Sequence, residues 1–564
     1  MELRAPATVM KAARLGAFHQ SRLSFMRQLL RRLKREQWQF QRPLWTINAQ
    51  GVGRAVYVAQ GPQRAYSLVA FAHDLDPALR SDRVIATAWD ATFALFDGIP
   101  QAADLDRLEA NVPKQEAGRI TSSELCLARA NRSVRLFDHV VQVLAEGRQP
   151  DRAAVDEVGY LMRTTAVYGS GKFGAADRER IALRPELAAP FQAEMLTVFL
   201  IRAFTVDLVE HLAQARSPET AVTLQVALRR RFGMGNSTGL GMAPFLLNHP
   251  VLLNNWVRAK ETALLRVRAV QRPTAAECSR FVDFVHRAQA DALHWHSAHE
   301  LQGLRINGLQ QDFKQLMQRI DGGVLQRDYP WDELYRWAEQ TLTLEGQEQV
   351  VSLLIEPYGH LVDELGDTMQ ADESLTFTLD GSLRVGALRD ALGAHYAWVA
   401  DIDFTAEHNQ ALFWYVSQEK LEPRLGQRYA EPGQALEQPL AVARDIAHLQ
   451  QALALFNDQD RVATFLLAHP EHRHAVRRVQ LAASHPYADI QDNLIARTLL
   501  PIDLLRCKLS FFGATQFDPR SDRWVRINMY QNAPFPHELS QVPADDWSYP
   551  SLANLEHAHD PLVE

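Results

Sequence analysis

The sequence predicts a mainly α-helical protein, with a body of two helical lobes and a small antiparallel β-sheet formed by N-terminal and C-terminal segments. Three observations predict this fold. Long stretches between residues 121 and 509 repeat apolar side chains with the period of a helix. β-branched and aromatic residues concentrate towards the two ends of the chain instead. The pattern Ala-x-Phe-Leu-Leu-x-His-Pro occurs at 243–250 and again at 463–470, which suggests an internal duplication of the helical part.

Length and composition indicate a soluble globular protein of several domains. A chain of 564 residues exceeds the ~250–300 residues at which single hydrophobic cores stop growing. A content of 47% hydrophobic and 23% charged residues with a net charge of −7 disfavours a nucleic-acid partner. The three cysteines are odd in number and far apart, so we expect reduced thiols and a cytoplasmic location. No apolar stretch reaches the ~20 residues of a membrane span, and no secretory signal is recognisable at the start.

The N-terminal region combines a basic helix with a hairpin. Residues 9–38 have helical apolar spacing with arginines between, which predicts a docking helix whose arginines are solvated. Residues 55–58 and 66–71 are typical of strands and flank Gly61-Pro62, so they predict a hairpin, to which 83–89 would add a third strand.

Helical periodicity dominates the middle of the chain, and the end is extended. The predicted helical stretches include 124–144, 186–214, 250–270, 275–319, 344–365 and 434–456. In the first of them, Arg129 and Arg132 are three residues apart and would share one helical face, where they could clamp a carboxylate. Residues 510–513 and 524–530 are predicted to be extended, and the last strand would pair with the early hairpin.

Five segments follow from these patterns. They are a basic N-terminal helix (1–45), a small α/β region with the hairpin (46–120), a first helical lobe (121–375), a second helical lobe (376–509), and a C-terminal strand with an irregular tail (510–564). The repeated octapeptide relates the two lobes if it reflects duplication, and a ligand site would then lie between them. A helix that ends before His-Pro and restarts at the proline explains the same pattern without duplication.

The segment 231–245 is the strongest candidate for a binding site. It holds four glycines within nine residues, and glycine is favoured where another group must approach the backbone closely. Its amide groups and the start of the following helix could receive an anion. The residues predicted to contact this anion here are Gly233, Gly235, Asn236, Ser237, Thr238, Gly239 and Asn248. A plain interhelical turn is the competing interpretation, because the segment matches no nucleotide-binding motif.

A second glycine-rich segment, 168–174, supplies a candidate cation. Lys172 stands between its glycines and could contact a phosphate or carboxylate. Arg163 precedes this segment within an apolar stretch, where a merely solvated arginine is not expected. Lys172 and Arg163 therefore join the predicted anion-binding set, with an exposed lysine in a tight turn as the simpler interpretation of Lys172.

Acid–base candidates lie in two places. His249 follows the first glycine-rich segment directly. Glu356 and His360 are four residues apart beside Pro357, so a carboxylate and an imidazole could act together at a helix break. His249, His360 and Glu356 are the predicted catalytic residues, with salt-bridged surface residues as the alternative for the last two.

Metal ligands are not assigned from the sequence. No H-E-x-x-H motif occurs among the many histidines of 283–300. The Glu-x-x-His spacing of di-iron proteins occurs at Glu471 to His474 and again at Glu556 to His559, which is too little to identify iron or zinc.

The function predicted from the sequence is that of a soluble enzyme. It would bind a small metabolite bearing a carboxylate or phosphate between helical lobes and use acid–base chemistry, with no cofactor identified and a homo-oligomer left open. Two alternatives stand beside it: a non-catalytic helical scaffold that binds a partner chain, and a metal- or haem-dependent helical oxygenase.

Overall fold

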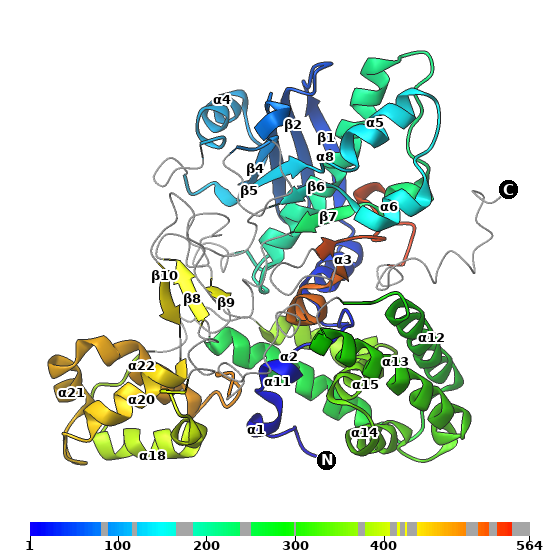
Figure 1. Ribbon diagram of the computed structural model, residues 1–564. Helices are drawn as coiled ribbons and strands as arrows, with labels where there is room; N and C mark the ends of the chain where they lie inside the picture. Colours follow the sequence, from blue (N-terminus) through cyan, green and yellow to red (C-terminus); the bar gives the residue numbers. More distant parts are fainter. Residues whose placement is uncertain are drawn as a thin grey trace. The chain divides into compact units, whose positions relative to one another are not determined.

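The computed structural model describes most of the chain (Figure 1). The described residues are 1–79, 88–114, 121–164, 184–236, 250–297, 300–369, 378–406, 414–417, 423–425, 437–440, 442–491, 506–517 and 527–543. Contacts divide the chain into two compact units, each made of three segments. Unit 1 comprises Met1–Phe18, Leu240–Phe281 and Gln311–Lys508, and unit 2 comprises His19–Gly239, Val282–Gln310 and Leu509–Glu564. The five-segment division made from the sequence stays a prediction.

A nine-stranded sheet forms the centre of unit 2. In spatial order its strands are β1 (Gln39–Trp45), β2 (Gly53–Gln60), β3 (Ala65–Ala72), β4 (Ala91–Asp97), β5 (Glu124–Arg132), β6 (Tyr160–Thr164), β7 (Gly233–Asn236), β12 (Ile527–Met529) and β11 (Ala514–Phe517). Neighbouring strands are antiparallel except β6 and β7, which are parallel. The sheet is therefore mixed.

Helices cover both faces of this sheet. α8 (Gln192–Arg216) packs against β3 to β7, and its Phe204 ring meets the Phe93 ring of β4 at 5.4 Å between centroids. Alanines of β3 and β5 let this long helix approach closely, since they add little volume between backbone layers. The opposite face of β2 to β5 packs on Leu108 of α4 (Ala102–Asn111) and on Val112. Burial of the strands on both faces explains their nearly continuous apolar sequences.

The prediction of a mainly α-helical fold with a small sheet is wrong. The chain is mixed α/β, because the sheet has nine strands and several of them come from the predicted first helical lobe. Residues 124–132 form strand β5, although the helical period of apolar residues over 124–144 predicted a helix there. A central strand buried on both faces lacks the alternation that distinguishes strands from buried helices. The C-terminal strands extend the sheet beyond β7 and do not pair with the early hairpin of β2 and β3, and Lys508–Phe512 forms a π-helical turn.

The other helices of unit 2 surround the sheet. They include α3 (Phe25–Arg35), α5 (Phe137–Ala145), α6 (Arg152–Val158), α9 (Val226–Arg231) and the short turn η7 (Pro536–Glu538). Arg27 of α3 is fully buried. The prediction that the arginines of this region are solvated is therefore wrong for Arg27.

Unit 1 is mostly helical. Its elements include α1 (Pro6–Val9), α2 (Ala12–Leu15), α11 (Pro250–Arg268), α14 (Pro330–Thr341), α15 (Leu344–Ile355), α16 (Gly359–Val362), η3 (Asp363–Met369), α18 (Val385–His395), η4 (Ala397–Asp401), α20 (Val442–Leu453), α21 (Val462–Ala468), η5 (Pro470–His472) and α22 (Arg473–Ala482). A separate three-stranded sheet has the order β10 (Glu437–Leu440), β8 (Trp414–Ser417) and β9 (Pro423–Leu425). The helices α12 (Ala275–Ala292) and α13 (Glu300–Asp321) contribute to both units.

Buried charges hold the first residues of the chain in unit 1. Arg4 pairs with Glu261 of α11 at 2.7 Å and with Glu348 of α15 at 2.8 Å. Glu348 also pairs with Lys260 and with Arg14, each at 3.2 Å. Both carboxylates are fully buried, so their cations are needed to compensate for lost hydration.

Within the described ranges, no helix combines the length and the apolar character that a bilayer crossing requires.

Candidate ligand site on the sheet of unit 2

Four neighbouring strands place one row of polar residues and a glycine across the sheet of unit 2. Asn131 of β5 is the register partner of Arg163 of β6. Arg163 is paired with Gly235 of β7, and Gly235 is paired with Asn528 of β12. Paired residues of adjacent strands point to the same face of a sheet, so this polar row occupies one face.

The polar row lies on the face opposite α8 and is buried. Met234 of β7 faces α8, where the Thr205 hydroxyl contacts its sulfur at 3.6 Å, so the adjacent Gly235 faces away. Asn131, Arg163 and Asn528 are only 1%, 2% and 3% exposed. Burying a guanidinium and two amides in a sheet centre costs free energy unless each is paired or serves a bound group.

Glycine is required at both β7 positions on this face because neighbouring atoms occupy the place of a side chain. A Cβ on Gly235 would lie 2.6 Å from the ring of Tyr160, and one on Gly233 would lie 2.7 Å from the Met529 carbonyl oxygen. The next nearest atom to Gly233 is the Cβ of Gln531 at 3.1 Å. Tyr160 and Gln531 therefore pack over alternate residues of β7, beside the polar row.

Two polar groups beside the row, on residues outside it, have no hydrogen-bond partner among the described residues. They are the Tyr160 hydroxyl and the side-chain oxygen of Gln531, on residues that are 1% and 3% exposed. Leaving such a group unsatisfied costs about 1–3 kcal/mol, so each is expected to bond to water or to a bound molecule.

The amide of Asn131, in contrast, is hydrogen-bonded through both its oxygen and its nitrogen. Its Oδ1 accepts a hydrogen bond from the Asp90 amide at 2.9 Å, and its Nδ2 donates to the Ala88 carbonyl at 3.1 Å. Asn528 donates from Nδ2 to the Val158 carbonyl at 3.4 Å. These hydrogen bonds fix the side chains at the two ends of the row, Asn131 and Asn528. Arg163 and Gly235 lie between them.

The parallel strands β6 and β7 end side by side. Thr164 and Asn236, their last described residues, are register partners. The sequences that continue from them are the two glycine-rich segments, 168–174 and 237–241. Ligands of α/β proteins bind outside the carboxyl ends of parallel strands, so the polar row adjoins the edge at which a ligand is expected.

The structure assigns the predicted anion-binding residues to different places. Arg163 and Gly235 belong to the polar row, and Gly233 and Asn236 belong to the same strand β7. The Gly233 amide donates to the Gly159 carbonyl at 2.8 Å, so it is part of the sheet ladder. The predicted residues Lys172, Ser237, Thr238, Gly239, Asn248 and His249 lie outside the described residues.

The predicted acid–base pair Glu356 and His360 belongs to unit 1. The predicted helix break is present, since α15 ends at Ile355 and α16 begins at Gly359. Glu356 is fully buried at the end of α15. The His360 side chain is 63% exposed, and its Nε2 lies 4.0 Å from Glu277. The two side chains thus face different environments.

The arginine clamp predicted on one helical face is wrong, because Arg129 and Arg132 lie in strand β5 and point to opposite faces. The Arg129 guanidinium lies over the Trp89 ring at 3.7 Å, whereas Arg132 lies 3.6 Å from Asp90. Sequence reasoning also missed Asn131, Tyr160 and Asn528, because only the strand register brings them together. The one signal for them is an amide or an arginine within an apolar strand.

Comparisons of the chain with protein-family models, with curated proteins and with solved structures found no match. The assignment of a function therefore depends on the site geometry alone.

Proposed function

We propose that the chain binds a small metabolite bearing a carboxylate or phosphate on this face of the unit 2 sheet and acts on it by acid–base chemistry. The observation that supports this proposal is the row from Asn131 through Arg163 and Gly235 to Asn528. In the sequence, the two glycine-rich segments follow strands β6 and β7 of this row. A guanidinium binds carboxylates and phosphates through two parallel hydrogen bonds. Arg163 would provide the charge, and the row would fix the orientation of the anion.

The remaining groups would complete the site. The Tyr160 hydroxyl can donate a hydrogen bond to the anion or to a reacting oxygen. Lys172 would add a second cation from the segment after β6, and the amides of 237–239 would receive the anion after β7. His249, with Asn248 beside it, would be the first choice as general base, because it follows the first glycine-rich segment directly in the sequence. Glu356 and His360 take second place, because the Glu356 side chain is fully buried whereas the His360 side chain is 63% exposed. A cytoplasmic location and a homo-oligomer stay part of this proposal.

The substitution Tyr160→Phe tests the proposal most cleanly. It removes only a hydroxyl that has no partner among the described residues and keeps the ring that packs over Gly235. We expect the free protein to be as stable as the wild type or more so, because an unsatisfied group is lost. Binding of inorganic phosphate and of malonate, measured by calorimetry on the full chain, should weaken about 5- to 10-fold, as for one lost hydrogen bond.

Tyr530→Phe is the matched control. The Tyr530 hydroxyl is also buried, but it donates to the Met195 carbonyl at 3.0 Å. This variant should lose about 1 kcal/mol of unfolding free energy and keep the affinity for both anions. Failure of wild type to bind either anion above millimolar affinity would contradict the proposal. So would unchanged affinity in Tyr160→Phe together with unchanged affinity in Arg163→Lys, provided that both variants melt like the wild type.

A further inference from the structure

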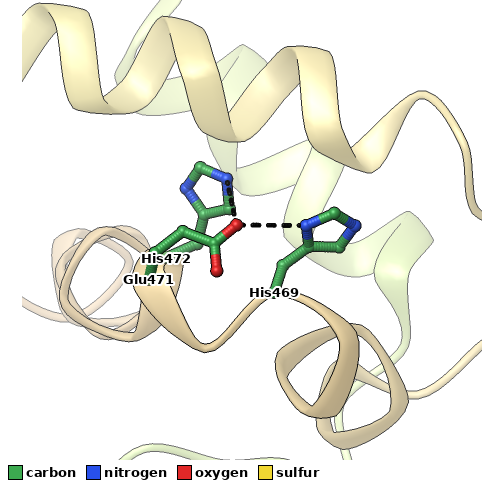
Figure 2. A group of neighbouring side chains, drawn as sticks. All are labelled: His469, Glu471 and His472. Atoms are coloured by element: carbon green, nitrogen blue, oxygen red, sulfur yellow. Dashed lines mark hydrogen bonds and ion pairs between the residues drawn. The ribbon is translucent and has the colours of Figure 1, made fainter.

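Three side chains that can bind a metal converge at a turn of unit 1 (Figure 2). Helix α21 ends at Ala468, the turn η5 spans Pro470–His472, and α22 begins at Arg473. From this turn Glu471 extends between the imidazoles of His469 and His472. Its Oε1 lies 3.1 Å from His469 Nδ1 and 3.8 Å from His472 Nε2. It is the one such group of three found among the described residues.

These distances are close to those of a tetrahedral metal site. With metal bonds of about 2.0–2.1 Å to nitrogen and oxygen, tetrahedral geometry separates neighbouring donor atoms by about 3.3 Å. The three donor atoms all lie within 4.8 Å of one another, so side-chain rotations alone can bring them to this separation. The exposed fractions of the His469, Glu471 and His472 side chains are 29%, 61% and 13%, so an ion can enter from solvent.

Aromatic packing holds both imidazoles in place. The buried ring of Phe465 stacks on His469 at 5.3 Å and on His472 at 5.8 Å between centroids. Phe456 meets His469 edge to face at 5.8 Å. Fixed rings lose less conformational entropy when they bind an ion, and this lowers the cost of assembling the site.

We propose that His469, Glu471 and His472 bind one divalent transition-metal ion of the zinc class. Two imidazole nitrogens and one carboxylate oxygen form the ligand set that zinc and non-haem iron sites use, whereas calcium and magnesium favour oxygen ligands alone. Three protein ligands leave at least one coordination position for water or for a substrate oxygen, as in catalytic sites. The site belongs to unit 1 and does not depend on the anion site of unit 2.

The Glu-x-x-His spacing noted in the sequence connects Glu471 with His474, whereas the structure brings Glu471 together with His469 and His472. His474 is exposed on α22 and is not part of the group of three. The ligands come from His469-x-Glu471-His472, because the 3-10 turn Pro470–His472 brings His469 and His472, which are three residues apart, to one side.

The test is zinc binding by the chelator-stripped full chain, measured by competition with a chromogenic chelator. The variants are His469→Ala, His472→Ala and Glu471→Gln, with His474→Ala as the matched control. Wild type and His474→Ala should bind one zinc ion with equal affinity, and each ligand variant should bind at least about 10-fold more weakly. Cobalt should give the visible absorption of a tetrahedral site in wild type and in His474→Ala, but not in the three ligand variants.

Thermal melting of each apo variant should match the wild type, because these side chains are partly exposed. Two results would overturn the proposal. One is the absence of stoichiometric zinc binding in the wild type. The other is wild-type zinc affinity in a double variant that lacks both His469 and His472, since the bound ion would then lie elsewhere among the chain's 20 histidines.

Discussion

Replacement of Arg4 by methionine should destabilise unit 1 strongly. The Arg4 guanidinium donates to Glu261 from Nε at 2.8 Å and from Nη2 at 2.7 Å, and it donates to Glu348 from Nη1 at 2.8 Å. Methionine keeps much of the side-chain volume and removes the charge. The substitution therefore isolates the electrostatic contribution.

The size of the expected loss in unfolding free energy depends on which of the two carboxylates is left without a counterion. Glu348 keeps Lys260 and Arg14, each at 3.2 Å. Glu261 is fully buried and loses the partner that binds both of its oxygens. Removal of one member of a buried ion pair costs about 3–5 kcal/mol, because the other charge stays buried and unpaired. We expect a loss of this size in the free energy of unfolding.

Urea denaturation followed by circular dichroism measures this loss. The double variant Arg4→Met with Glu261→Gln should recover part of the stability, since the uncompensated charge is gone. Arg272→Met is the control on an exposed pair, Arg272 with Asp328 at 2.8 Å, and it should leave the transition unchanged. A loss below about 1 kcal/mol in Arg4→Met would refute the assignment of these charges to a buried network.

The pH dependence has a defined sign. Burial alone would raise the pKa of Glu348, but the attraction of Arg4, Lys260 and Arg14 outweighs it and holds this pKa well below the ordinary value. A depressed folded-state pKa contributes stability above the ordinary pKa of about 4.3, and this contribution is lost as the pH falls below it. Wild type should therefore lose stability steeply below about pH 4.5, and Arg4→Met should show a shallower decline.

Further predictions concern packing and thiols. Gly16→Ala should cost about 3 kcal/mol or more in urea denaturation, since its Cβ would lie 2.3 Å from the carbonyl carbon of Arg506, and wild-type stability would contradict this overlap. Gly235→Val should lower the melting temperature through overlap with the ring above it, so it cannot isolate ligand binding. Burial raises the pKa of Cys126 far above its ordinary range, so a thiol reagent should label the half-buried Cys278 first; equal rates for both would be inconsistent with the fold.

The buried network also affects how a scaffold function can be tested. Deletion of residues 1–38 would remove Arg4 and Arg14 together with α3. If the truncated chain no longer bound a partner chain, unfolding of unit 1 would explain this as readily as the loss of a binding surface. A point substitution on an exposed residue, such as Arg35, whose side chain is 63% exposed, separates the two effects.

Some parts of the fold could be predicted from the sequence because local signals were strong. The early hairpin is present as β2 and β3, since β-branched runs flank a Gly-Pro turn. The stretches at 250–270 and 344–365 contain helices α11 and α15, where apolar side chains recur with the helical period. Strand β5 was missed, because a strand buried on both faces resembles a buried helix.

The residues of the candidate sites could also be predicted only in part. The sequence singled out Arg163 and the glycines near 235, because a charge in an apolar stretch and glycines in a cluster are unusual by themselves. It could not connect Arg163 with Asn131 or Asn528, which are 32 and 365 residues away.

What the sequence by itself determined is therefore local: turns, helical periods and the unusual residues that mark a site. The tertiary structure decided which of these residues meet. Strand register brings Asn131, Arg163, Gly235 and Asn528 into one row, and a 3-10 turn brings His469, Glu471 and His472 together. The physical reason is that register and packing are set by the burial of whole faces, to which each residue contributes only a small part of the free energy.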